Sequence, residues 1–318
     1  MESNKFKILN TVNFDKYSLG IILSKTFLAQ AKTKGIKILC GHLMYFMHNV
    51  DLWCQWFIRL GIQPITVTDD ISTINEDDLC VVIAQVFDKC PAKHYIAIQT
   101  ENFTTIGQYP ESYNTTVDKN KCLNVLQNAY VVWDYSISNI EYLMTNHQIN
   151  KIVPIGVMFS DNTSLFKTIY LSNNFENRNI DIIVSTNTPR RVEFTKLLQE
   201  KQLKCGSVWR TALPSVIHTC KIFLNIHAYG EISALEIHRL FDLRNCQIVI
   251  VSEQSADVDY QNTFNKIPFL KLEDIPDFCH KLCNDKELWN KYLEDQLNMW
   301  KRITNDVIHQ ELESVLYI

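Results

Sequence analysis

The 318-residue chain has little of several features that mark special classes of protein. It contains only eight glycines and eight prolines, and it shows no low-complexity run or internal repeat. Hydrophobic residues make up 46% and charged residues 21%, close to the globular average, which excludes long disordered stretches. No apolar run approaches the length of a membrane span, and residues 1–10 lack the apolar core of a signal peptide. We therefore expect a cytoplasmic protein with no transmembrane segment.

The chain also lacks a strong excess of either charge. It has 31 Lys and Arg against 35 Asp and Glu, a net charge of −4, and no concentrated basic stripe. Proteins that bind nucleic acid neutralise many phosphates with lysine and arginine, so the composition disfavours a nucleic-acid partner.

Ten cysteines occur without a C-x-x-C pair, and the closest two, Cys279 and Cys283, are one helical turn apart. Together with His280 they could suggest zinc, but zinc needs four convergent ligands and no second cluster is present. We interpret the cysteines as reduced thiols. Asp257 and Asp259 fit a bare D-x-D pattern in a polar loop, where we expect solvated acids, so no metal site is predicted.

Short apolar segments alternate with helical or polar stretches, a pattern typical of parallel sheets in α/β proteins. The expected strands are residues 36–40, 64–67, 80–84, 95–99, 130–133, 180–184, 222–226 and 247–251. The expected helices are residues 17–34, 49–60, 190–202, 232–245 and 286–310. Trp53 and Trp56 recur at helical spacing, which predicts a core position and not a sugar-binding platform.

The length of the chain is sufficient for two domains, each with its own core. Polar segments interrupt the pattern between residues 154 and 179. We therefore predict a first domain at residues 1–157 and a second at residues 158–318.

The most informative segment is residues 222–255, where a helix lies between two apolar strands. In open α/β sheets, ligands bind beyond the carboxyl ends of the strands. The polar residues expected at those ends are Asn225, His227, Tyr229, Ser252 and Glu253. None of them is needed to build a strand, so we look for the function here.

Several pieces of sequence occur in an order that resembles one enzyme family. They are LNIHAY from residue 224, Glu236, Arg239, Asp242, VIVSE from residue 249, NTPRR from residue 187, VWDYSISN from residue 132, VPIGV from residue 153 and YIAIQTEN from residue 95. This order is similar to glycosyltransferases of the GT-B fold, more narrowly to the group 1-like and spore-maturation-type enzymes of bacteria and large DNA viruses. The resemblance implies two Rossmann-like domains with parallel sheets flanked by helices. It also implies a closing helix at residues 286–310 that crosses back to the first domain, and a host-cytoplasmic location if the chain is viral.

By this resemblance, residues 158–318 bind a nucleotide sugar, UDP- or GDP-linked, which is the substrate, and no cofactor is required. Residues 1–157 form the acceptor side. Asn187, Arg190 and Arg191 lie where a helix begins after a strand, so helix-start amides and guanidinium groups could meet the diphosphate. An alternative is a solvated arginine or a pair with Glu193. Relatives have a glycine-containing loop where this chain has residues 185–187.

The resemblance assigns Asp242 to the ribose hydroxyls, although Gln247 stands where glycine is typical. Glu236, Arg239 and Asp242 are also spaced for ion pairs on a helix surface, which is the simpler explanation. His227 could donate to the sugar or the diphosphate with Asn225 positioning it, or it could be a satisfied structural group. Ser252 and Glu253 would project into the same crevice.

Glu101 and Asp134 follow strands of the first half and could supply the base that an inverting enzyme needs. Asp134 could instead cap the next helix together with Ser136. With His227, these two acids are the catalytic candidates.

The sequence thus predicts a metal-independent glycosyltransferase that moves a sugar from a nucleoside diphosphate to a hydroxyl on a glycan, protein or lipid-linked acceptor. A catalytically inactive nucleotide-sugar-binding protein and a sugar-nucleotide epimerase of the same fold are the alternatives.

Overall fold

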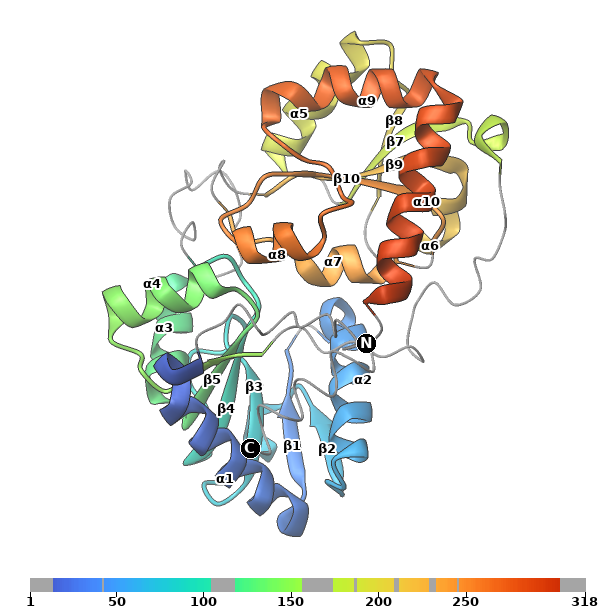
Figure 1. Cartoon of the computed structure of the whole chain (residues 1–318). Coiled ribbons are helices and arrows are strands. Elements are labelled where there is room, and N and C mark those ends of the chain that lie inside the picture. The colour runs from blue at the N-terminus through green and yellow to red at the C-terminus, as the bar shows by residue number, and fades with distance from the viewer. Residues whose placement is uncertain are drawn as a thin grey trace, which may run out of the picture. The chain divides into compact units, whose positions relative to one another are not determined.

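The structure is a computed structural model, and it describes residues 14–41, 43–103, 118–155, 174–185, 188–208, 212–228, 233–244 and 246–303. The described residues form two compact units that separate between residues 155 and 174. We call residues 14–155 unit 1 and residues 174–303 unit 2. Each unit has one parallel β-sheet with helices on both faces, which confirms the predicted fold class (Figure 1).

The sheet of unit 1 has six parallel strands in the order β2-β1-β3-β4-β5-β6. The strands are β1 Ile36–Leu39, β2 Ile65–Thr68, β3 Leu79–Ile83, β4 His94–Gln99, β5 Val131–Asp134 and β6 Ile152–Pro154. Buried side chains alternate between the two faces, because successive residues of a strand point in opposite directions. Both faces therefore need a covering layer of helices.

The helices of unit 1 are α1 Ser18–Lys34, α2 Leu43–Arg59, α3 Lys119–Asn128 and α4 Ile137–His147, with 3-10 turns at Phe14–Tyr17 and Ile71–Thr73. Helices α3 and α4 share one core cluster with β3, β4 and β5. Helices α1 and α2 meet the other face at Trp133 of β5, whose indole nitrogen donates to Ser24 of α1 over 2.9 Å. Trp56 of α2 packs edge-on against Trp133, with 5.6 Å between ring centroids. Trp53 and Trp56 are buried, which confirms the predicted core position.

The sheet of unit 2 has five parallel strands in the order β11-β10-β9-β7-β8. The strands are β7 Ile180–Ser185, β8 Cys205–Val208, β9 Cys220–Asn225, β10 Val249–Glu253 and β11 Phe269–Leu270. Counted within each unit, both sheets begin second-first-third-fourth-fifth, and the sheet of unit 1 adds a sixth strand at its edge. In such sheets the chain reverses its direction of winding next to the first strand, and that switch point is where ligands bind. In unit 2 it lies between β7 and β9.

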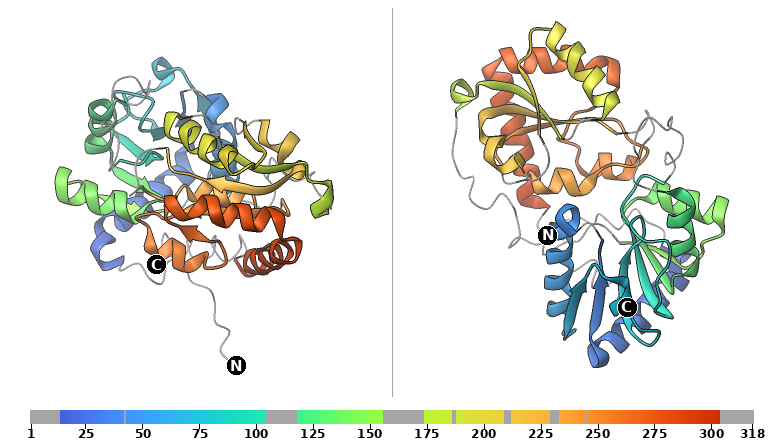
Figure 2. Two further views of the ribbon diagram at one scale, coloured as in Figure 1. Left: turned by 90° about the horizontal axis from the view of Figure 1, so that it is seen from above. Right: turned by 180° about the vertical axis from the view of Figure 1, so that it is seen from behind.

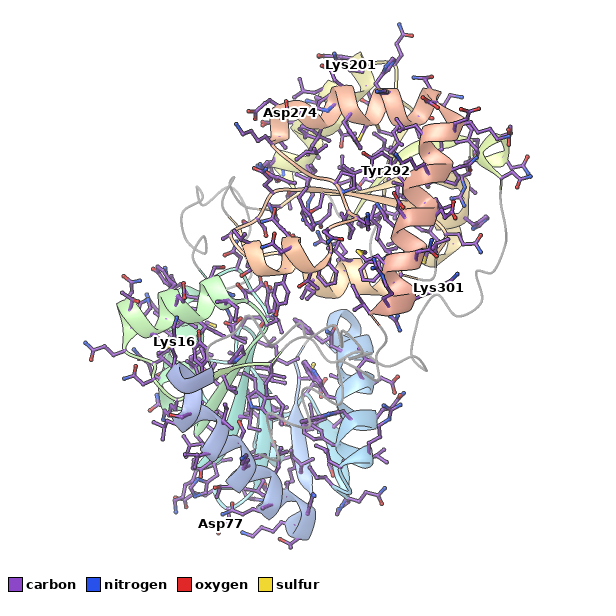
Figure 3. All side chains as sticks on the ribbon, viewed as in Figure 1. Lys16, Asp77, Lys201, Asp274, Tyr292 and Lys301 are labelled. Atoms are coloured by element: carbon purple, nitrogen blue, oxygen red, sulfur yellow. The ribbon has the colours of Figure 1, made fainter. Side chains whose placement is uncertain are left out.

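The helices of unit 2 are α5 Pro189–Glu200, α6 Leu213–Val216, α7 Ile237–Asp242, α8 Val258–Thr263, α9 Ile275–Asn284 and α10 Lys286–Arg302, with 3-10 turns at Phe175–Asn177, Ile217–Thr219 and Leu272–Asp274. Figures 1 and 2 show α5 and α9 on one face of the sheet and α7 and α8 on the other. Helices α5 and α9 form one core cluster with the inward side chains of β7, β9 and β10. Figure 3 shows that charged side chains such as Lys201 and Asp274 project outward.

The predicted helix at residues 232–245 is wrong at its start, because α7 begins only at Ile237. Residues 233–236 are not helical, and Asp257 binds this segment, since its carboxylate accepts a hydrogen bond from the Leu235 amide at 2.8 Å. The Ala256 amide also donates to the Ser233 carbonyl at 2.9 Å. Asp257 is only 3% exposed, so the expectation of a solvated acid is wrong as well. A buried acid that accepts from a backbone amide is not distinguishable in sequence from a loop acid.

Helix α10 packs on its own sheet. Gln296, which is buried, donates to the Ile250 carbonyl at 2.8 Å and accepts from the Ile250 amide at 2.9 Å. Gln296 thereby makes the hydrogen bonds that a neighbouring strand would make, because β11 pairs with β10 only at Ser252 and Glu253 and does not reach Ile250. The predicted continuation of this helix to residue 310, and its return to the first domain, fall partly outside the described residues.

Candidate functional site

Most of the donor-site residues predicted from sequence lie together at the carboxyl ends of β7, β9 and β10 in unit 2. The group comprises Arg190, Arg191, Asn225, His227, Glu236, Arg239, Ser252 and Glu253. It spans the switch point of the sheet, since Arg190 and Arg191 start α5 directly after β7 while Asn225 ends β9. We call these eight residues the switch-point cluster.

Arg190 and Glu253 form the first part of the switch-point cluster. The guanidinium of Arg190 grips the Glu253 carboxylate with two parallel bonds, of which Nη1 to Oε2 measures 2.7 Å. The same Nη1 donates to the His227 carbonyl at 2.9 Å, and the His227 amide donates to Glu253 Oε2 at 3.0 Å. Side-chain exposure is 15% for Arg190 and 3% for Glu253, so the arginine is the one that solvent reaches. Bidentate arginine–carboxylate pairs fix orientation as well as charge.

Arg191 is 3% exposed, and its guanidinium hydrogen-bonds backbone carbonyls. Its Nε donates to the Ile226 carbonyl at 2.8 Å and its Nη1 to the Ser185 carbonyl at 2.9 Å, so it joins the ends of β7 and β9. Glu236 lies 3.7 Å from its other terminal nitrogen. Both arginines bind partners other than Glu193, the residue considered from the sequence as an alternative partner for one of them.

His227 has no exposed surface and lies between two acceptors. Its Nδ1 is 2.8 Å from Glu236 Oε2, and its Nε2 is 2.8 Å from the carbonyl of Gln254, a residue that sequence reasoning missed. Burial opposes protonation, but the charge of Glu236 and the hydrogen bonds outweigh it and raise the pKa of His227. Burial would also raise the pKa of Glu236, yet His227 and Arg239 hold it well below its usual range.

Asn225, Ser252 and Arg239 complete the switch-point cluster. The Asn225 side-chain amide donates to Ser252 Oγ at 3.0 Å and to Glu236 Oε2 at 3.2 Å. Its oxygen accepts from Arg239 Nη1 at 2.6 Å. Arg239 also lies 3.6 Å from Glu236 at i,i+3 spacing. Arg239 therefore has the predicted ion pair, but the pair belongs to a partly buried network and not to an open helix surface.

The charge of the switch-point cluster is unbalanced. Three arginines face two carboxylates, Glu236 and Glu253, and protonated His227 would add a further positive charge. Thr188 caps α5 and places the positive end of the helix dipole at the same edge. An excess of positive charge at a helix start suits an anion such as a diphosphate.

The side chains of three residues predicted from the sequence cannot be placed. Asn187 lies outside the described residues, as does Tyr229. Asp242 ends α7, but its side chain is not among those described.

The two catalytic candidates of unit 1 lie at the carboxyl ends of β4 and β5. Asp134 is fully buried, and its Oδ1 accepts from the Ser136 amide at 2.9 Å and from the Asn139 side chain at 3.3 Å. Ser136 caps α4. Asp134 thus organises the start of α4, in line with the structural alternative considered for it. Glu101 is partly exposed, and its carbonyl accepts from Gln99 at 2.7 Å and from Asn139 at 2.8 Å.

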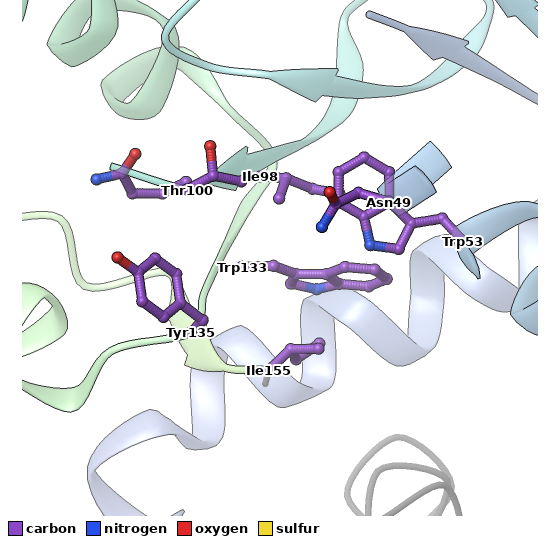
Figure 4. A pocket seen from close by; sticks show the side chains of 8 residues that line it. Asn49, Trp53, Ile98, Thr100, Trp133, Tyr135 and Ile155 are labelled. Atoms are coloured by element: carbon purple, nitrogen blue, oxygen red, sulfur yellow. The ribbon is translucent and has the colours of Figure 1, made fainter. Parts of the chain in front are cut away.

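A small pocket lies at the same edge of unit 1 (Figure 4). Trp53 and Trp133 form its apolar walls, and Asn49, Thr100 and Tyr135 add polar groups. Its free volume of about 20 Å³ holds roughly one water molecule. The pocket is therefore too small for a whole sugar. One of its lining residues, Thr100, directly precedes Glu101 in the sequence.

Neither a metal cluster nor a membrane helix is found in the part of the chain that the structure describes. No three His, Cys, Asp or Glu side chains there come together in a way that could hold a metal ion. No helix among the same residues is both long and apolar enough to cross a membrane.

No family model matches the sequence, and no curated protein matches it either. Solved structures do match. A DNA-modifying β-glucosyltransferase, solved with and without uridine diphosphoglucose, has a TM-score of 0.55 at 10% identity over 89% of this chain and 100% of its own. The T4 phage enzyme described as BGT in complex with UDP and Mn²⁺ has a TM-score of 0.53 at 9% identity, over 89% of this chain and 99% of its own. The chain therefore has the GT-B fold predicted from its sequence.

Proposed function

We propose that the chain is a glycosyltransferase whose donor is a nucleoside diphosphate sugar bound at the switch-point cluster. The observation that carries the proposal is the excess positive charge of that cluster at the start of α5. A similar solved structure binds UDP in the same fold, which supports a uridine nucleotide. The narrower likeness to group 1-like and spore-maturation-type enzymes stays a prediction.

Sugar transfer requires that the diphosphate leave with its charge stabilised. Arg190 and Arg239 keep 15% side-chain exposure each, and together with the α5 amides they would lie against the developing charge. An acceptor hydroxyl must lose its proton, and Glu101 is our candidate for that role, because Asp134 is fully buried. An inverting reaction needs such a base, whereas a retaining one depends chiefly on the phosphate contacts.

We propose a hydroxyl of a glycan, protein or lipid-linked acceptor. The β-glucosyltransferase in the comparison is described as DNA-modifying, so DNA is the obvious alternative. Residues 1–163 contain 13 Lys and Arg against 15 Asp and Glu, whereas a DNA-binding surface needs a local excess of positive charge. Binding of duplex DNA that weakens steeply with salt would refute this choice of acceptor.

We also propose transfer without a resident metal. One similar structure contains Mn²⁺, which a divalent-metal enzyme would coordinate with carboxylates. Here Glu236 and Glu253 bind histidine and arginine, so the donor set of the described cluster does not fit a divalent ion. Donor hydrolysis in excess chelator should equal hydrolysis in added Mn²⁺, and complete loss of activity with chelator would contradict the proposal.

The direct test is calorimetric titration of UDP-glucose, UDP and uridine, combined with a nucleotide-release assay. UDP-glucose and UDP should bind and uridine should not, because the diphosphate provides the contacts. Release of UDP from the sugar distinguishes a transferase from an inactive binding protein, and isomerisation of the donor without release would indicate an epimerase.

Two variants make the test specific. Arg239→Gln should weaken UDP-glucose binding about tenfold, since it removes one partly exposed cation from the site. Arg302→Gln, at the exposed end of α10, should leave binding unchanged. Equal affinities in both variants would remove the switch-point cluster from the donor site.

A further inference from the structure

The side chain of His227 occupies an unusual place in the switch-point cluster. Neither face nor edge of its ring is exposed, and each ring nitrogen has one oxygen at 2.8 Å. A neutral imidazole carries a proton on one nitrogen only, so it needs a donor opposite the other. The nature of the two oxygens therefore determines the protonation state.

The oxygen facing Nε2 is the backbone carbonyl of Gln254, which can only accept. Nε2 must therefore carry a proton. The oxygen facing Nδ1 belongs to Glu236, whose other neighbours in the cluster are all donors: the Asn225 amide, Arg191 and Arg239. A carboxylate surrounded by donors is ionised, so Nδ1 must carry a proton as well.

The charged groups near the His227 ring lie on or next to three elements, α5, α7 and β10. Arg190 and Arg191 start α5, Arg239 lies on α7, and the two carboxylates are Glu236 before α7 and Glu253 at the end of β10. The arginines repel a charged ring, but the Glu236 carboxylate is in direct contact with Nδ1 at 2.8 Å, and Glu253 accepts from the His227 amide at 3.0 Å. The pKa of His227 is raised despite complete burial, in agreement with this geometry.

We infer that Glu236 and the Gln254 carbonyl hold His227 as a permanent imidazolium, which makes His227 a positioning residue and a fixed positive charge behind the donor diphosphate. It offsets the buried carboxylates, so that Arg190 and Arg239 present their charge to the ligand. The ring does not donate a proton to the substrate, in contrast to the catalytic role considered from the sequence. The link to the diphosphate rests on the proposed function, whereas the charge state does not.

The charge state is tested on the ligand-free protein by nitrogen NMR of its histidine rings. Both nitrogens of one buried histidine should show the signature of the protonated ring from about pH 6 to pH 8.5, where an ordinary histidine titrates near 6.5. In Glu236→Gln that same ring should become neutral within this range, which also assigns the signal without a variant at His227. A neutral His227 ring at pH 7.5 in the unaltered protein would overturn the inference.

The role is tested by titrating UDP-glucose, whose diphosphate diester does not change charge over this range. The unaltered protein should bind it with less than about twofold variation between pH 6 and pH 8.5, whereas Glu236→Gln should lose about tenfold over the same interval. Arg302→Gln is the control and should behave like the unaltered protein. A pH-independent loss in Glu236→Gln would overturn the positioning role.

The two proposals fail differently. If UDP-glucose does not bind the unaltered protein at any pH while NMR finds the imidazolium, the donor site is wrong and the positioning role falls with it. If UDP-glucose binds but the ring is neutral, the donor site stands and the fixed charge is refuted.

Discussion

The pair formed by Arg190 and Glu253 allows a structural effect to be separated from a binding effect. In Arg190→Met the Glu253 carboxylate, 3% exposed, loses both guanidinium bonds and keeps only the His227 amide. Removing one partner of a buried pair costs about 3 to 5 kcal/mol, and the partial exposure of Arg190 favours the lower end. We expect unit 2 to lose about 3 kcal/mol of unfolding free energy.

A second change should recover most of that loss. Glu253→Gln in the Arg190→Met background removes the uncompensated charge, while its amide oxygen can still accept from the His227 amide. The double variant should regain about 2 kcal/mol of the unfolding free energy lost by Arg190→Met alone. UDP-glucose binding should not recover, because the cation that faces the ligand is still missing.

Urea unfolding followed by circular dichroism measures the stability of the two single variants and the double variant. The coupling energy of this cycle isolates the interaction between the two side chains. Single losses that simply add in the double variant, within about 0.5 kcal/mol, would refute the argument. Recovery of UDP-glucose affinity along with stability would assign Arg190 to structure alone.

Three further predictions concern stability, each read from the urea midpoint. Gln247 has a φ of +47°, so Gln247→Gly should raise the unfolding free energy by about 1 kcal/mol. A lower unfolding free energy would show that contacts of the Gln247 side chain outweigh the relief of its backbone. A Cβ on Gly20 would lie 2.6 Å from a β6 carbonyl oxygen, so Gly20→Ala should destabilise the protein by at least about 2 kcal/mol. Gly206→Ala is the control and should not destabilise it, because the nearest atom to its Cβ would lie at 3.9 Å. Equal effects of the two variants would refute the close packing of Gly20. Gln296→Ala should lower the unfolding free energy by about 3 kcal/mol, because an amide and a carbonyl of β10 lose their hydrogen-bond partner. Asn298→Ala, on the exposed face of α10, is the control and should lower it by less than about 1 kcal/mol. Similar losses in the two variants would show that Gln296 does not replace a strand.

The sequence predicted eight strands, and each coincides with a strand of the structure to within two residues at its ends. The apolar runs are strong signals because buried parallel strands need them on both faces. It missed β6, β8 and β11. These are short, and β8 carries Gly206 and partly exposed residues at the edge of its sheet, so no apolar run marks it.

The structure gives a reason for the glycine that the family resemblance expects at the position of Gln247. Gln247 has a positive φ, the conformation that glycine favours, so a glycine would fit here without a change of the backbone. By contrast, no pattern in the sequence reveals that Gln254 offers its carbonyl to His227 or that Asp257 holds the segment before α7. Both contacts join residues more than twenty positions apart, and they depend on loop geometry that periodicity does not encode.

The sequence indicates which residues lie in the candidate site, but not which hydrogen bonds and ion pairs join them. The positions of Asn225, His227, Ser252 and Glu253 at the ends of predicted strands indicated that they belong to the site, because parallel strands bring their carboxyl ends to one edge of the sheet. The sequence could not distinguish which arginine faces solvent. The structure assigns Arg191 to the backbone and leaves Arg190 partly exposed.

We propose that a nucleoside diphosphate binds at the switch-point cluster of unit 2. Amide hydrogen exchange with and without saturating UDP tests this most directly, because it locates the bound ligand along the chain. We predict slower exchange at the start of α5 and at residues 226–228, with unit 2 otherwise little changed. Saturating UDP that leaves those amides unaltered and protects another segment instead would contradict the account.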